Sequence, residues 1–423
     1  MRMTRRRLLQ STVAAGAVTV VPASVFGKNA PSERITLGCI GMGGQGVHNN
    51  MNNFLGCADA RVVTVCDVFE TRSKRAAALV DKRYRAAGCK AITDFRGIIA
   101  DESIDAVVIS TPDHWHVPMS LMALQAGKDV FCEKPTLTIA EGRALVNEVN
   151  TRKAVFQIGL EDRSVVHYHK MVEWLRNGAI GDLVRVDLQL PNGFVFPKEK
   201  PIPVPAGLNY ELFVGPAQWL PYTKNRTTQR YWRMTQNFAN GSLVDWGSHQ
   251  FDTAQLAVND PDVCPVNVEG TGEIPKNAFT TVPVKFDVTY RYGNGVEVRV
   301  KSGGTALRLT GTKGWVGNDK WRGPLKASDR KILLTRYTPE TSKHWQRPPG
   351  EQRNFLDCVK SRKPTTYTAE TMHQLHTSLH LGVIAIQLGR KLTWNPRKEE
   401  FINDDAANAL RSRTPRDDWR KKG

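Results

Sequence analysis

The sequence lacks long apolar runs: none approaches the roughly 20 residues that a membrane-spanning helix needs, so we expect no membrane span. Its seven cysteines form an odd number and include no Cys-x-x-Cys pair, which argues against a disulfide framework. It also has no internal repeat and no low-complexity block. The chain has 423 residues, which is long enough for two globular domains.

Negative charge is in short supply: 59 lysines and arginines face 41 aspartates and glutamates, for a formal net charge of +18. The positive residues are spread along the whole chain and are densest in the last stretch, RSRTPRDDWRKKG. Binding of nucleic acid would call for a concentrated basic stripe with a matching motif, and neither is present. We therefore expect no nucleic-acid partner and interpret the charge as a solvated basic surface, with steering of anionic substrates as the alternative.

The N-terminus has the order of an export signal. A basic start is followed by an apolar stretch at residues 13–21 and then by small residues. The paired arginines before Leu8 and Leu9 resemble a twin-arginine (Tat) signal. We predict that residues 1–27 are a signal peptide and that the protein is exported to the periplasm; a basic disordered tail is the alternative. The twin-arginine route carries folded proteins, which fits a core with reduced thiols.

Strands and helices alternate in the first half of the chain. Apolar, Val/Ile-rich runs predict strands at residues 35–40, 61–67, 104–111, 128–135 and 154–159. Helical patterns lie between most of them, so the segment predicts βαβ units in a parallel sheet that is buried on both faces. We predict a Rossmann domain over residues 33–160.

The pattern changes after about residue 160. Alternating segments at 183–190, 283–292, 295–303 and 306–316 predict an antiparallel sheet, and a long helix is expected at 370–389. We predict an α/β protein overall, in which residues 161–423 form a C-terminal α+β domain with a mostly antiparallel sheet.

A glycine-rich turn follows the first predicted strand. Gly41, Gly43 and Gly46 form G-x-G-x-x-G between a strand and a helix. In a dinucleotide site the first glycine permits the tight turn, the second lets backbone N–H groups approach the pyrophosphate, and the third allows close packing of helix and strand. We predict that these glycines and Met42 bind a dinucleotide; an ordinary turn in a parallel sheet is the alternative.

An acidic residue ends the second predicted strand, about twenty residues beyond the turn. Asp67 would accept hydrogen bonds from the ribose hydroxyls of the adenosine. It would repel a 2′-phosphate, so NAD is favoured over NADP, although Arg72 and Lys74 lie near enough in sequence to weaken this preference.

A Glu-Lys-Pro triplet ends the strand predicted at 128–135. Ligands of open parallel sheets bind at the carboxyl ends of the strands, where Glu133 and Lys134 fall, as does the segment STPDHWH at 110–116. We therefore count Ser110, Thr111, Glu133 and Lys134 among the cofactor-binding residues. Lys134 would also polarise a substrate hydroxyl, and a cis bond is predicted before the proline. A surface lysine is the alternative.

Oxidation of a hydroxyl also needs a base, and histidine is the usual choice at neutral pH. Asp245 and His249 are four residues apart in LVDWGSHQFD, a spacing that puts both on one face of a helix. We predict an Asp–His pair in which Asp245 orients the imidazole. Metal binding by this pair is the rival interpretation, but a third ligand is not apparent, so no metal is predicted.

The segments GCIGMGGQG, STPDHWH, CEKP and DWGSH, in this order, resemble the glucose–fructose oxidoreductase/inositol dehydrogenase family (Gfo/Idh/MocA). The resemblance covers nearly the whole mature chain and extends to the exported branch of the family. It implies a Rossmann domain, a C-terminal domain with a large open sheet, and a homo-oligomer. It also implies that Lys134, Asp245 and His249 are catalytic and that His116 lies near the nicotinamide.

Two positions depart from the family's pattern. The family often has asparagine where Asp113 stands, and exported relatives commonly carry glutamine before the arginine in the segment that reads GLEDRS here. We expect Glu161 and Asp162 to alter substrate preference, and we predict Arg163, Trp232 and Arg233 as substrate contacts. For the last two residues, core packing and surface charge are equal alternatives.

Three histidines, His373, His376 and His380, form a stripe along the predicted helix at 370–389. A metal stripe and cleft-lining or surface histidines are the two interpretations, and the second is favoured.

The resulting hypothesis is an exported NAD-dependent oxidoreductase acting on a sugar or polyol hydroxyl with a tightly bound cofactor. The alternative is a redox-neutral enzyme that cleaves glycosides through a transient keto sugar. A binding or sensor protein is a third class.

Overall fold

The computed structural model describes residues 34–259, 264–338, 340, 343 and 347–416. The predicted signal peptide, residues 1–27, lies outside these residues, as does the end of the basic C-terminal stretch.

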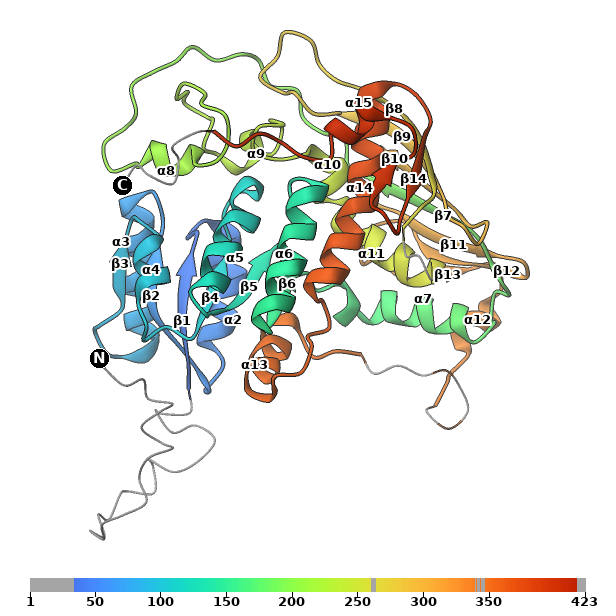
Figure 1. The fold of residues 1–423 in the computed structure, drawn as a ribbon. Coiled ribbons are helices and arrows are strands. Elements are labelled where there is room, and N and C mark those ends of the chain that lie inside the picture. The colour runs from blue at the N-terminus through green and yellow to red at the C-terminus, as the bar shows by residue number, and fades with distance from the viewer. Residues whose placement is uncertain (1–33, 260–263, 339, 341–342, 344–346, 417–423) are drawn as a thin grey trace. The chain divides into compact units, whose positions relative to one another are not determined.

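A six-stranded parallel sheet forms the first half of the described chain, in the order β3-β2-β1-β4-β5-β6 (Figure 1). Its strands are β1 (Ile35–Ile40), β2 (Ala60–Cys66), β3 (Lys90–Ile92), β4 (Ala106–Ile109), β5 (Asp129–Glu133) and β6 (Phe156–Gly159). Five of the six were predicted. The missed one, β3, has only three residues and is largely exposed, so it carries no apolar pattern. The order reverses between β1 and β4, which is where such sheets bind ligands.

Both faces of this sheet are buried, because side chains alternate between them. Val107 and Val130 belong to one apolar core, whereas their neighbours Val108 and Phe131 belong to another. The first core continues through the second half of the chain and includes Val288.

A second sheet of nine strands has the order β13-β12-β11-β7-β10-β9-β8-β14-β15. Its strands are β7 (Leu183–Leu190), β8 (Asn267–Glu273), β9 (Lys285–Arg291), β10 (Glu297–Ser302), β11 (Leu307–Gly311), β12 (Gly314–Asn318), β13 (Lys326–Ala327), β14 (Leu392–Asn395) and β15 (Glu400–Phe401). The pairings are antiparallel except that β10 runs parallel to β7. The sheet is therefore mixed and mostly antiparallel, as predicted apart from this one pair.

Burial alternates along the strands of the second sheet, as β9 shows. One face packs on the apolar core and the other is solvated, the usual arrangement of an antiparallel sheet.

The longest described helix, α14 (Ala369–Leu388), packs on α6 (Ile139–Arg152) of the parallel-sheet half and on β8 and β9 of the mixed sheet (Figure 1). Other helices near the site are η3 (Gln45–Met51), α2 (Asn52–Leu55), α3 (Glu70–Tyr84), η4 (Asp113–Trp115), α5 (His116–Gln125), η5 (Asp162–Ser164), α9 (Gln229–Trp232), α10 (Gly241–Asp245) and α11 (Gly247–Val258). The remainder are α4 (Arg96–Ala100), α7 (Val166–Arg176), α8 (Tyr210–Val214), α12 (Arg330–Leu334), α13 (Glu351–Ser361) and α15 (Asp405–Ala409).

The long connection between β7 and α10 reaches the loop that follows β2. The Asn209 N–H donates to the carbonyl of Val68, and the Glu70 N–H donates to the carbonyl of Gly207, each at 2.9 Å. We call residues 205–233 the crossing arm, since this segment borders the carboxyl end of the parallel sheet.

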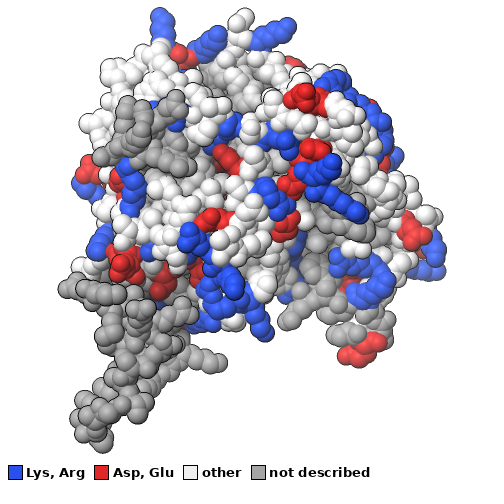
Figure 2. Space-filling model, viewed as in Figure 1, with Lys and Arg blue, Asp and Glu red and all other residues white. Residues whose placement is uncertain are grey.

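Charged side chains of both signs are interspersed over the face of the molecule in Figure 2, with lysine and arginine in excess. Among the described residues, no helix is long and apolar enough to cross a bilayer.

Candidate active site

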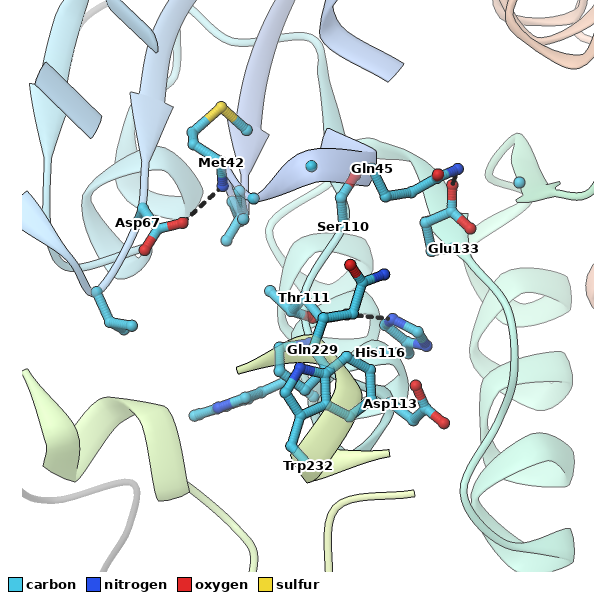
Figure 3. A pocket seen from close by; sticks show the side chains of 18 of the residues that line it. Met42, Gln45, Asp67, Ser110, Thr111, Asp113, His116, Glu133, Gln229 and Trp232 are labelled. Atoms are coloured by element: carbon cyan, nitrogen blue, oxygen red, sulfur yellow. Dashed lines mark hydrogen bonds between the residues drawn. The ribbon is translucent and has the colours of Figure 1, made fainter. Parts of the chain in front are cut away.

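A cavity of about 590 Å³ lies at the carboxyl ends of the parallel strands. The glycine turn and the loops after β2, β4 and β5 form one side, and α9, the start of α11 and Trp321 contribute to the other. Figure 3 shows the part around the glycine turn and Trp232. The cavity thus joins the predicted cofactor segments to the predicted reacting residues in one space.

The glycine turn has the backbone that a dinucleotide requires. Gly41 has φ +90°, and a Cβ there would lie 2.4 Å from the carbonyl oxygen of Ser110. A Cβ on Gly46 would lie 1.8 Å from the carbonyl oxygen of Gly41. A Cβ on Gly43 or Gly44, in contrast, would meet nothing within 4 Å. Gly41 and Gly46 are needed by the chain itself, because a side chain at either would collide with the backbone. The open space at Gly43 is the cradle that a pyrophosphate would fill.

Asp67 lies just after β2 and is buried. Its Oδ2 accepts from the N–H of Met42 and its Oδ1 from the N–H of Phe69, each at 2.8 Å (Figure 3). Burial raises the pKa of this carboxyl, and the backbone N–H groups and Arg72 oppose the shift. Each oxygen keeps acceptor capacity, so Asp67 is placed for the ribose of a bound dinucleotide.

Residues from β4 and β5 continue the cofactor surface. Glu133 Oε1 accepts from Gln45 Nε2 at 2.9 Å and from Asn50 Nδ2 at 2.8 Å, which ties the end of β5 to η3. Ser110 Oγ accepts from the same Asn50 amide. The Oγ1 of Thr111 is buried without a protein partner, which is a polar atom for a ligand to satisfy. These features fit a bound NAD.

Lys134, just after β5, and Asp245, the last residue of α10, meet although they are far apart in sequence. Lys134 Nζ donates to Asp245 Oδ1 at 2.5 Å and to the Asp245 carbonyl at 2.9 Å. Arg233 Nε lies 3.6 Å from the other carboxylate oxygen. Burial opposes ionisation of Asp245, but the charges of Arg233 and Lys134 prevail and hold its pKa well below the usual range. Lys134 is thereby anchored at the cavity wall. The predicted cis bond is present between Lys134 and Pro135.

His249 has a different partner from the one predicted. Its Nδ1 lies 2.6 Å from Oδ2 of Asp162, which is fully buried. The prediction that Asp245 orients the imidazole was wrong because the Asp245 carboxylate is engaged by Lys134 and Arg233 instead. An Nδ1–H donated to Asp162 leaves Nε2 as the basic nitrogen of a ring that lines the cavity.

The second oxygen of Asp162 faces the mixed-sheet half. Asp162 Oδ1 accepts from Trp321 Nε1 at 3.3 Å and lies 3.5 Å from Arg322. Arg322 also pairs with Glu161. Burial opposes ionisation of Glu161, but His249 and Arg322 lower its pKa overall.

The ligand atoms of Glu161, Asp162 and His249 lie within 4.8 Å of one another, so this group, which does not include Asp245, has the three ligands that a metal site would need. Arg322 contacts both carboxylates and already brings the positive charge that a cation would add. We therefore keep the interpretation of an Asp–His pair rather than a metal centre.

Asp113 lines the cavity and is buried. Burial and the neighbouring Asp245 raise its pKa to about 8. At neutral pH it is therefore largely the neutral acid, which has the shape of an asparagine side chain.

The predicted substrate contacts divide into two groups. Trp232 and Arg233 line the cavity, on and just after α9. Arg163 is not among the lining residues: its guanidinium pairs with Asp252 at 2.7 Å, donates to the Thr366 carbonyl, and lies over the Tyr367 ring. This placement contradicts the predicted role of Arg163 as a substrate ligand, because its donors are already engaged by the protein.

Sequence reasoning missed the aromatic wall of the reacting side. Trp246 and Trp321 both line the cavity, with ring centroids 5.3 Å apart. Trp321 follows β12, a strand that was expected only in part, so its position had no signal in the sequence. The position of Asp162 did have a signal in the sequence, because Asp162 comes shortly after β6, at the carboxyl end of the sheet.

Two protein-family models match the chain. Residues 35–160 match an oxidoreductase family described as an NAD-binding Rossmann fold, and residues 197–421 match its C-terminal alpha/beta domain.

Curated relatives match over little more than a third of the chain. The chain is 33% identical over 156 residues to inositol 2-dehydrogenase 1 of Saccharopolyspora erythraea, covering 36% of this chain and 44% of the relative. It is 29% identical over 172 residues to a glycosyl hydrolase family 109 protein of Shewanella putrefaciens, covering 38% of this chain and 36% of the relative. The match therefore spans less than half the length of these relatives.

Solved structures are similar over most of the chain. One is GenD2 from gentamicin A biosynthesis in complex with NAD, at 20% identity and TM-score 0.62, covering 91% of this chain and all of the other. Another is a levoglucosan dehydrogenase in complex with NADH and L-sorbose, at 18% identity and TM-score 0.61, covering 85% and 99%. At these identities the likeness shows the fold.

Proposed function

Because the chain belongs to the Gfo/Idh/MocA oxidoreductase family, we propose that it is an exported NAD-dependent oxidoreductase acting on a sugar or polyol hydroxyl. One observation carries the proposal: Lys134 and His249, from separate halves of the fold, line the same cavity as the glycine turn. A lysine that binds oxygen and a histidine base beside a dinucleotide cradle are the groups that oxidation of a carbinol needs.

The cofactor side rests on residues already described. Gly43 and its neighbours would hold the pyrophosphate, Asp67 the adenosine ribose, and Thr111 and Glu133 would lie on the nicotinamide side. When bound there, NAD supplies the acceptor for the hydride that leaves the carbinol carbon.

On the reacting side of the cavity, Lys134 and His249 have separate roles, and each is held by an aspartate. Lys134 donates a hydrogen bond to the substrate oxygen and stabilises the negative charge that grows on it as the C–H bond breaks. His249 takes the hydroxyl proton on Nε2, and Asp162 stabilises the imidazolium that results. The carbinol loses one proton and one hydride and becomes a carbonyl. Asp245 keeps Lys134 in place throughout.

The cavity wall fits a carbohydrate. Trp232, Trp246 and Trp321 offer flat apolar rings to the cavity, and a sugar has apolar C–H faces that can pack on them. The named activity of the inositol 2-dehydrogenase relatives supports the same substrate class.

Export is supported by the order of charge and hydrophobicity in residues 1–27. Free NAD is scarce outside the cytoplasm, so an exported enzyme would retain its cofactor, and the crossing arm borders the cleft that would hold it. A test replaces Arg5 and Arg6 together by lysine: periplasmic fractionation should show the protein retained in the cytoplasm, and unchanged export would contradict a twin-arginine signal.

We also propose a homo-oligomer that uses the solvated face of the mixed sheet. Side chains there border a hollow of about 490 Å³ and include Arg185, Arg299, Lys301, Arg308 and Trp315. Light scattering of the purified protein tests this, and a monomer at micromolar concentration would contradict it.

To test the proposed oxidoreductase activity, a panel of sugars and polyols is added to the purified protein, and formation of reduced nicotinamide is followed by its absorbance. Turnover should disappear in Lys134→Met and in His249→Asn. A protein that neither carries nor binds a nicotinamide would contradict the proposal.

A second candidate function is redox-neutral cleavage of a glycoside, which the similarity to a glycosyl hydrolase family 109 protein supports. The same residues would first make a keto sugar, which acidifies the adjacent C–H and permits elimination of the glycosidic group as an alcohol. Water would then add to the resulting C=C bond, and the hydride would return to the carbonyl. Release of free sugar from glycosides without any added acceptor would favour this function over net oxidation.

A further inference from the structure

The three residues after Lys134 have their backbone polar groups bound by side chains. His116 Nδ1 lies 2.8 Å from the Pro135 carbonyl, and Asn240 Nδ2 donates to the Leu137 carbonyl at 2.9 Å. Between them, Thr136 is bound on both sides by two histidines of α14. This segment is neither helix nor strand, so these side chains replace the backbone partners that regular structure would provide.

The contacts to Thr136 fix the form of both rings. The Thr136 N–H donates to His376 Nδ1 at 3.3 Å, so this nitrogen carries no proton. The Thr136 carbonyl lies 3.0 Å from His380 Nε2, which must therefore carry one. Both rings are buried and both pKa values are lowered by that burial. His376 is thus a neutral ring with its proton on Nε2.

The other side of His376 contacts the helix of the catalytic base. Its Nε2 lies 3.1 Å from Ser248 Oγ, and the hydroxyl of Ser248 donates to the Val244 carbonyl at 2.7 Å. The direction of donation is consistent from Thr136 through His376 and Ser248 to Val244. Ser248 precedes His249 and Val244 precedes Asp245, so the chain of hydrogen bonds ends beside both residues.

Given the proposed function, on which this inference rests, we propose that His376 is a positioning residue of the active site. It joins Thr136, two residues beyond Lys134, to Ser248, the neighbour of His249, and so fixes the separation between the lysine and the imidazole. Lys134 comes from the parallel sheet and His249 from the mixed-sheet half, so their separation depends on contacts between the two. The ion pair with Asp245 holds the tip of the Lys134 side chain, and His376 joins the segments that carry the two residues. An error of about 1 Å in such a placement can cost about a hundredfold in rate.

The α14 histidines do not form a metal stripe. His373 Nε2 lies 2.6 Å from Glu399 and its Nδ1 contacts Thr377, whereas His376 and His380 face Thr136. His373 is as buried as His376 but contacts no segment next to a catalytic residue. It is therefore a matched control for loss of a buried histidine on the same helix.

The test compares His376→Asn, Ser248→Ala and the control His373→Asn in the full-length protein carrying NAD. In His376→Asn the amide is too short to reach Ser248, so the same link breaks as in Ser248→Ala. We expect each of these two variants to lower kcat about tenfold, a smaller loss than a 1 Å displacement gives, with KM for the sugar nearly unchanged. The double variant should be no slower than either single one, because one link is lost in each case.

A second readout separates positioning from a general loss of structure. With substrate deuterated at the reacting carbon, the isotope effect on kcat should rise in His376→Asn and Ser248→Ala, because hydride transfer becomes slower than product release. His373→Asn should melt earlier but keep the wild-type kcat and isotope effect.

The inference is overturned if His376→Asn and Ser248→Ala keep the wild-type kcat, or if they lose activity only in proportion to their unfolded fraction and keep the wild-type isotope effect. These outcomes differ from failure of the proposed function. If the proposed function fails, the wild-type protein itself shows no nicotinamide-linked turnover, or Lys134→Met is as active as wild type.

Discussion

Asp162 and His249, 87 positions apart in sequence, meet at 2.6 Å through a fully buried carboxylate and the Nδ1 of the imidazole. The contact joins the segment after β6 to the helix α11. It therefore sets both the orientation of the ring and the nitrogen that faces the cavity. Asp245, the acid nearer in sequence, is used instead to anchor Lys134.

This relationship predicts a large effect of Asp162→Asn. The amide no longer stabilises the imidazolium and permits the wrong ring tautomer, so we expect kcat to fall by about 100-fold or more. Binding of NAD should change little, because Asp162 is not among the residues that line the cavity. Steady-state kinetics and NAD titration check both points. The neighbouring substitution Glu161→Gln is the control and should be milder; equal effects of the two would contradict the specific role of Asp162.

Removal of the Lys134 ammonium should affect stability as well as activity. Lys134→Met removes the nearer cationic partner of Asp245 and leaves Arg233 at 3.6 Å. Loss of one member of a buried ion pair costs about 3–5 kcal/mol of unfolding free energy, and we expect a loss below that range because Arg233 remains. Denaturant unfolding with and without NAD measures it. Lys134→Met together with Asp245→Asn should recover part of the loss, and no recovery would contradict a coupled pair.

Asp245 also predicts how the protein responds to acid. Its pKa is lowered in the folded state, so its contribution to stability is present above the unfolded pKa of about 3.9. That contribution is lost as the pH falls below this value toward the folded-state pKa. Asp245→Asn should therefore be less stable than wild type at pH 7, and the difference should shrink in strong acid. Unfolding curves at several pH values test it; a constant difference would show that Asp245 is not the titrating group.

The local elements and the cofactor motif could be predicted because each is a short-range pattern. Apolar runs marked five parallel strands, and the glycine turn with Asp67 followed from spacing along the chain. The partner of His249 could not, because Asp162 is 87 positions away and the i,i+4 argument considers only neighbours on one helix. Arg163 was misassigned for a related reason: Asp252, which binds its guanidinium, is 89 positions away. The parallel pairing of β7 with β10 is another long-range contact without a local signal.

Asp113 gives a pH effect on stability that is opposite in sign to that of Asp245. Its folded-state pKa is raised to about 8, above the usual value of about 3.9. The folded protein therefore holds a proton that the unfolded chain releases, and stability falls as the pH rises from about 4 to about 8. Asp113→Asn keeps the shape and removes the titration. Melting temperatures should show the variant gaining on wild type between pH 5 and pH 8, whereas a constant difference would mean that Asp113 is ionised in the folded state.

The glycine turn allows fold and cofactor binding to be tested separately. A Cβ on Gly43 meets nothing within 4 Å in the protein, whereas one on Gly46 would lie 1.8 Å from the Gly41 carbonyl oxygen. We therefore expect Gly43→Ala to unfold at nearly the wild-type temperature, because the methyl group fills only open space. If the pyrophosphate occupies that space, the same methyl group blocks its approach, and NAD affinity should fall by about tenfold or more, which corresponds to about 1.4 kcal/mol. Gly46→Ala should instead destabilise the protein even without NAD, because the backbone of the turn must move. Calorimetric titration with NAD and thermal unfolding of the two variants distinguish these effects. Wild-type NAD affinity in Gly43→Ala would place the dinucleotide elsewhere and remove the cofactor from the cavity that Lys134 and His249 share.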